Sequence, residues 1–95
     1  MYELRVLQKA RSDMKKSAAW YDKQQPGVGD RFLLAVVAEF SLIVVNPLHY
    51  EEKFSKTFRF APVERFPFLI VFRIKGQQII VNSVFHTSRN PKRFV

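Results

Sequence analysis

RFPFLIVFRIKGQQIIVNSVFHTSRNP, residues 65–91, is the stretch that decides the fold of this 95-residue chain. Its two apolar runs, residues 66–74 and 79–85, read as β-strands and flank a short turn at Gly76 and Gln77. The first run is apolar on both faces as far as Val71, which is typical of a central strand. We therefore predict an antiparallel hairpin in the middle of a sheet, and it ends at a histidine followed by several cations.

The rest of the chain predicts two helices and two further strands. Residues 2–7 and 57–61 alternate as short strands do. Residues 9–24 have apolar positions at helical spacing, and residues 30–46 carry a broad apolar stripe that ends at Asn46-Pro47. The predicted fold class is thus α+β, in the order β-α-α-β-β-β. A helical hairpin packs on one face of an antiparallel sheet, within a single domain of residues 1–95.

Charge is the first functional signal. The net charge is +8, and it is uneven: seven Lys/Arg against five Asp/Glu give +2 in residues 1–50, whereas nine against three give +6 in residues 51–95. Such a balance favours nucleic acid, an acidic protein or an anionic membrane surface as partner. The chain has no cysteine, which excludes disulfides and thiolate metal sites. We find no signal-peptide pattern and no apolar run of ~20 residues, so a cytoplasmic location is predicted.

In element order and in its C-terminal third, the chain resembles the RelE/ParE superfamily of bacterial type II toxin–antitoxin toxins. The resemblance is carried by NP at 46–47, RFPF at 65–68, VFRI at 71–74 and VFHTSRNPKRF at 84–94. The ending is closer to the ParE-like branch, because RelE-like nucleases often place a tyrosine near the C-terminus and this chain has Phe94.

The resemblance implies a toxin that a cognate antitoxin neutralises, without cofactor or metal. A ParE-like toxin inhibits an essential target such as DNA gyrase. The alternative is a RelE-like, metal-independent endoribonuclease that cuts mRNA on the ribosome, and whether the chain is an enzyme stays open. A non-toxic basic nucleic-acid-binding module, or a decayed family member, is a further alternative. The +8 charge calls for an acidic antitoxin, laid over the helical hairpin or along a basic sheet face.

If the chain is a nuclease, the candidate catalytic residues are His86, Arg73 and Arg59. The imidazole suits acid–base work near neutral pH, and the guanidiniums can grip phosphate in a bidentate manner. Both arginines are expected on the helix-free face of the sheet, provided that the alternating apolar residues bury against the helices; these are Phe58, Phe60, Phe68, Ile70 and Phe72. The other reading is that His86 only caps its strand and that the arginines only solubilise the sheet.

The candidate binding residues are mostly cations of the basic half. They are Lys53, Lys56, Arg65, Lys75, Arg89, Lys92, Arg93 and Phe94. The two lysines of the loop before the sheet correspond weakly to lysines that RelE-like nucleases use. Trp20 and Tyr21, on the first predicted helix, are expected to be core or helix–sheet packing residues, and a role in binding a partner is the alternative.

Overall fold

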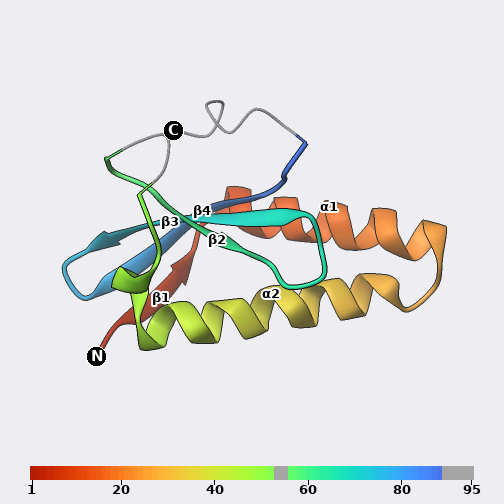
Figure 1. Ribbon diagram of the computed structural model, residues 1–95. Coiled ribbons are helices and arrows are strands. Elements are labelled where there is room, and N and C mark those ends of the chain that lie inside the picture. Colours follow the sequence, from red (N-terminus) through yellow and green to blue (C-terminus); the bar gives the residue numbers. More distant parts are fainter. Residues whose placement is uncertain (53–55, 89–95) are drawn as a thin grey trace.

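The computed structural model describes residues 1–52 and 56–88, and it contains two helices against one sheet (Figure 1). In chain order the elements are β1 (Glu3–Val6), α1 (Gln8–Gln24), α2 (Val28–Val45), the short 3-10 helix η1 (Pro47–His49), β2 (Arg59–Pro62), β3 (Phe68–Lys75) and β4 (Gln78–His86). The predicted order β-α-α-β-β-β is confirmed. The second helix begins two residues earlier than the apolar stripe indicated, at Val28. None of the helices in the described residues is long and apolar enough to cross a membrane.

The four strands lie in the order β1-β4-β3-β2, and the sheet is mixed. Strands β2, β3 and β4 form an antiparallel meander, whereas β1 pairs with β4 in parallel, from Glu3 opposite Gln78 to Val6 opposite Val81. The prediction of a purely antiparallel sheet is therefore wrong at β1. The helical hairpin returns the chain to the end of the sheet at which β1 starts. The last strand of the three-strand meander, β4, then runs in the same direction as β1 and pairs with it.

The two helices cover one face of the sheet and enclose the main core (Figure 1). Phe32, Val36 and Ile43 of α2 are fully buried, and they meet Ile70 and Phe72 among other residues of the sheet. Aromatic rings fill the end of this core near the α1–α2 turn: the ring centres of Phe32 and Phe68 are 4.7 Å apart. The core explains why α2 carries such a regular apolar stripe.

The other face of the sheet holds a second, smaller apolar cluster of Phe60, Val71 and Phe85, each at most 4% exposed. Phe58 and Leu69 pack against it. The prediction that Phe58 and Phe60 bury against the helices is wrong. Alternation tells which residues share a face but not which face they share, and the register Phe60–Val71 turns these rings away from the helices.

A carboxylate joins the two helices at their turn. Asp22 accepts hydrogen bonds from the backbone N–H groups of Gly27 (3.2 Å) and Gly29 (2.8 Å), so it satisfies donors at the start of α2. Gly29 is buried, and a Cβ atom there would lie 2.4 Å from the carbonyl oxygen of Ala18. The close approach of α1 and α2 therefore requires glycine at this position.

Candidate functional site

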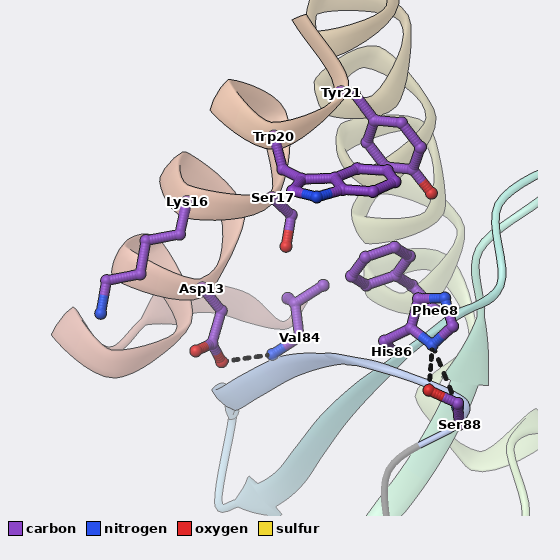
Figure 2. A pocket seen from close by; sticks show the side chains of 9 residues that line it. All are labelled: Asp13, Lys16, Ser17, Trp20, Tyr21, Phe68, Val84, His86 and Ser88. Carbon is purple, nitrogen blue, oxygen red and sulfur yellow. Dashed lines mark hydrogen bonds between the residues drawn. The ribbon is translucent and has the colours of Figure 1, made fainter. Parts of the chain in front are cut away.

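A cleft of about 400 Å³ opens between α1 and the end of β4 (Figure 2). The residues that line it are Asp13, Lys16, Ser17, Trp20 and Tyr21 of α1, Phe68 of β3, Val84 and His86 of β4, and Ser88. The α1 residues occur at i, i+3, i+4, i+7 and i+8, which is the spacing of one helix face. That spacing is the sequence signal from which the α1 side of the cleft could have been predicted. Of all the residues that line the cleft, only His86 was among the predicted site residues.

The walls of the cleft are aromatic and its rim is polar. Trp20 is 57% exposed, and its ring stands edge-on to that of Tyr21, with ring centres 5.2 Å apart. Tyr21 in turn packs on Phe68, and partial burial raises the pKa of its hydroxyl. The expectation that Trp20 and Tyr21 are packing residues is right for Tyr21, which belongs to the edge of the core, but wrong for the exposed indole. Tryptophan is enriched in protein–protein interfaces, so an exposed tryptophan beside a pocket is typical of a protein-binding surface.

His86 forms one wall of the cleft at the end of β4. Its ring lies edge-on to Phe68 at 5.2 Å, and its Nδ1 lies 2.7 Å from the Ser88 hydroxyl. The same Nδ1 accepts a hydrogen bond of 3.1 Å from the Ser88 backbone N–H, so this nitrogen carries no proton in this arrangement. Nε2 is then the protonated nitrogen of the neutral ring, and the imidazole is held by a turn of its own chain.

Asp13 links α1 to β4 on the opposite wall. Its Oδ2 accepts a hydrogen bond of 3.0 Å from the backbone N–H of Val84, and the carboxylate also pairs with Lys9 at 3.1 Å. The pairing of β1 with β4 ends at Val81, so beyond that residue the outer edge of β4 has no strand beside it in the described part of the chain. The Asp13 carboxylate accepts the one backbone hydrogen bond that a neighbouring strand would otherwise accept from Val84. This bond holds α1 at a fixed distance from β4 on this side of the cleft.

Arg59 lies on the helix side of the sheet edge, opposite Phe72 in the β2–β3 register. Its Nη1 donates a 2.6 Å hydrogen bond to the carbonyl oxygen of Tyr50, and its Nη2 lies 3.5 Å from Glu52. The expectation that it emerges on the helix-free face is wrong, for the same reason of register as for Phe58 and Phe60. The guanidinium instead ties the segment after η1 to β2.

Arg73 does lie on the helix-free face, half-buried and opposite Ile80. That face is not the open basic surface we expected along its length, because the cluster around Val71 occupies it. His86 pairs with Phe68, which lies five residues before Arg73 on β3. Along the strand, His86 and Arg73 are therefore about 17 Å apart. The two side chains also point to opposite faces, so the structure does not bring His86, Arg73 and Arg59 together.

The predicted binding cations are dispersed. Lys75 is exposed at the turn of the β3–β4 hairpin, and Lys56 is exposed before β2. Arg65, with a positive φ of 69°, is exposed in the turn between β2 and β3. Lys53, Arg89, Lys92, Arg93 and Phe94 lie outside the described residues. By contrast, α1 carries five Lys/Arg and two Asp, and both aspartates are engaged by the hydrogen bonds described above.

The chain is similar to known proteins over most of its length. A family model described as the ParE toxin of the type II toxin–antitoxin system parDE matches residues 4–91. A chain of the chromosomal ParDE TA system from P. aeruginosa is 20% identical, and the match covers 90% of this chain and 96% of that one with a TM-score of 0.83. At that identity the likeness supports the shared fold. No curated protein sequence matched significantly.

The family model spans almost the whole chain, including both helices, all four strands and the cleft between α1 and β4. The chain therefore belongs to the ParE toxin family of type II toxin–antitoxin systems.

Proposed function

We propose that this ParE-like toxin acts on DNA gyrase in the cytoplasm and is held inactive by an acidic antitoxin. The observation that carries the proposal is the ParE family match over residues 4–91. The geometry adds support, because a metal-free ribonuclease needs its base, acid and cations around one phosphate. Here His86 and Arg73 point to opposite faces of the sheet, and Arg59 is committed to Tyr50 and Glu52.

The decisive experiment is a supercoiling assay with purified gyrase, relaxed plasmid, ATP and increasing amounts of this protein. We expect supercoiling to be inhibited, and we expect transcripts mapped by primer extension after induction to stay uncut at ribosome-bound codons. The matched variant is His86→Ala, which would lose mRNA cleavage if the protein were a RelE-like ribonuclease that uses His86 as acid or base. If the wild-type protein cuts mRNA and His86→Ala does not, while gyrase is unaffected, the proposal is wrong. Growth that continues unchanged after induction would contradict both activities.

The antitoxin contact follows from the charge and the exposed aromatic surface of α1. Helix α1 carries five cations, and Lys16 lines the cleft in which Trp20 offers an exposed indole. An acidic segment that places an apolar side chain between Trp20 and Phe68 satisfies both features. We expect Trp20→Ala to weaken antitoxin binding at least about tenfold, or ~1.4 kcal/mol.

The control for that measurement is Leu48→Ala, which truncates a similarly exposed apolar residue on η1, away from the cleft. Titration calorimetry with the cognate antitoxin measures the affinities of both variants. Equal affinities for the two variants would show that the antitoxin docks elsewhere.

A further inference from the structure

The sheet carries two arginines in one row near the β3–β4 turn, beyond the apolar cluster around Val71. Arg5 of β1 and Arg73 of β3 are each paired with Ile80 of β4, one from either side. Three neighbouring strands therefore bring together residues that are far apart in the sequence. With strands spaced by about 4.8 Å, the Cα atoms of the two arginines lie roughly 10 Å apart.

The alternation of the strands determines the face on which this row lies. The neighbours of the two arginines along their strands pack against the main core beneath the helices; they are Leu4, Val6, Phe72 and Ile74. Arg5 and Arg73 therefore project from the face opposite the helices. Ile80 between them is only 4% exposed and belongs to neither apolar cluster. The aliphatic stems of flanking arginines can shield such a residue while their guanidiniums stay in water.

The guanidiniums of this row are available to a ligand. Within residues 1–52 and 56–88, no hydrogen bond or ion pair engages Arg5 or Arg73. Arg59 differs in this respect, because it is held by the carbonyl oxygen of Tyr50 and by Glu52. Two cations that do not serve the fold in this way can contribute their full charge to a partner.

Two further charged residues flank the row at the turn. Lys75 follows Arg73 by two positions and Glu3 precedes Arg5 by two, so both lie on the same face, where they are exposed. The paired positions Glu3 and Gln78, and Gln78 and Lys75, make them the two ends of the next row. Three cations and one carboxylate give this part of the face a net charge of +2, which favours an anionic ligand.

An aromatic ring extends the row of arginines on the side of β2. Arg59 pairs with Phe72, so in the same register the preceding residue, Phe58, lies beside Arg73. Phe58 is half-buried and packs against the apolar cluster of the helix-free face. Its ring is therefore on the same side of the sheet as the two guanidiniums, and the row combines a partly accessible ring with cations.

This combination suits a single-stranded nucleic acid better than an acidic peptide. A guanidinium binds phosphate in a bidentate manner, and an aromatic ring stacks on a base of any sequence. A peptide rich in carboxylates matches the cations but offers the ring no flat partner, and a duplex keeps its bases inside. We propose that Arg5, Arg73 and Lys75 bind the phosphates of a single-stranded nucleic acid while Phe58 stacks on one base. This surface is separate from the cleft, and the proposal does not depend on gyrase as the target.

Fluorescence anisotropy with a labelled oligothymidylate, in salt from about 50 to 200 mM, tests the proposal. Three phosphate contacts predict that the logarithm of the affinity falls against the logarithm of the salt concentration with a slope of about −2. Arg5→Ala and Arg73→Ala should each weaken binding about fivefold and reduce that slope by about 0.7. Phe58→Leu should weaken binding about fivefold or more at an unchanged slope, since it removes a ring but no charge.

Lys15→Ala and Lys23→Ala are the matched controls, because they remove the same charge from exposed positions of α1, on the other side of the sheet. They should leave the salt slope unchanged, and urea unfolding verifies that every variant is folded. The proposal is overturned if the wild-type protein does not bind at about 50 mM salt, or if the α1 variants weaken binding as much as the arginine variants.

A third contrary result would identify a different partner for this face. If Arg5→Ala and Arg73→Ala weaken antitoxin binding but leave oligothymidylate binding unchanged, the face binds an acidic protein and the proposal is wrong. Because gyrase is absent from this assay, none of these results bears on gyrase inhibition, which the supercoiling assay measures separately.

Discussion

The two helices pack side by side on the same sheet, yet their outer faces differ completely. Helix α1 shows five cations, an exposed indole and the cleft to solvent, whereas α2 shows Leu34, Val37, Leu42 and Val45. Only the inner faces are required by the fold, because only they fill the core. The outer faces are therefore not determined by the packing of the core, and a cationic face and an apolar face suit contacts of different chemistry.

The largest expected effect comes from comparing the inner and outer faces of α2. Phe32→Ala removes a fully buried ring that contacts Tyr21, Phe66 and Phe68, and we expect a loss of about 3–5 kcal/mol in the free energy of unfolding. Leu34→Ala, two residues away but 69% exposed, should change it by less than about 0.5 kcal/mol. Urea unfolding at low protein concentration, where association does not contribute, measures both. Comparable losses would mean that the outer face also supports the monomer fold.

The second-largest expected effect on stability concerns the turn between α1 and α2. Gly29→Ala places a Cβ atom 2.4 Å from the Ala18 carbonyl oxygen and 2.6 Å from Asp22 Oδ2, and we expect a cost of about 1–3 kcal/mol. At Gly27 a Cβ atom would meet nothing within 4 Å, but φ is +93°, so Gly27→Ala should cost only about 1 kcal/mol through backbone strain. Thermal unfolding compares the two. The reverse ranking would show that backbone conformation, and not the close approach of α1 to α2, controls this turn.

A third effect concerns the attachment of α1 to the sheet. Asp13→Ala removes the acceptor of the Val84 N–H group, and we expect a loss of about 1–2 kcal/mol together with faster hydrogen exchange of that amide. Asp13→Asn keeps an oxygen in the same place and should restore most of the protection. If the amide of Val84 exchanges equally slowly in both variants, the hydrogen bond does not hold α1 at the cleft.

The sequence predicted the elements well because their periodicities are strong and local. The alternation of residues 66–74 and the apolar stripe of α2 both mark segments that supply buried residues to the main core. Register is different, since shifting or flipping a four-residue edge strand leaves its alternation unchanged. For that reason Phe60 and Arg59 of β2 were assigned to the wrong faces, and the parallel pairing of β1 was missed.

The candidate site was harder to predict, because it depends on how α1 lies against β4. His86 was recognised by its chemistry, but Asp13 lies 71 residues away from its hydrogen-bond partner Val84. No local pattern encodes that contact. Likewise, the nuclease set of His86, Arg73 and Arg59 was plausible as a list of residue types, whereas the strand register determines that these residues lie apart.

The smallest expected effect concerns the hydrogen bond that attaches α2 to the segment after it. This bond is the counterpart of the Asp13 hydrogen bond that attaches α1 to the sheet. The Tyr50 hydroxyl donates a 2.6 Å hydrogen bond to Glu39 Oε2, and its ring packs edge-on against Phe72. Burial, followed by the nearby Glu39 carboxylate, raises the pKa of Tyr50 above its ordinary value of 10.0. The folded state therefore holds this proton more tightly than the unfolded state, so the contribution is complete below pH ~10 and is lost as the pH rises further.

We thus expect Tyr50→Phe to cost about 1 kcal/mol at pH 7 by removal of the hydrogen bond. We also expect the variant to lose less stability than the wild type as the pH rises above ~10, because it has no hydroxyl at this position to ionise. Urea unfolding across this range, with absorbance at alkaline pH to follow tyrosinate formation, makes the comparison. Tyr2→Phe is the matched control, since no hydrogen bond of its hydroxyl is found in the described part of the chain. Parallel alkaline losses in wild type and Tyr50→Phe would mean that another group carries the pH dependence, and that Glu39 does not anchor α2 to the loop.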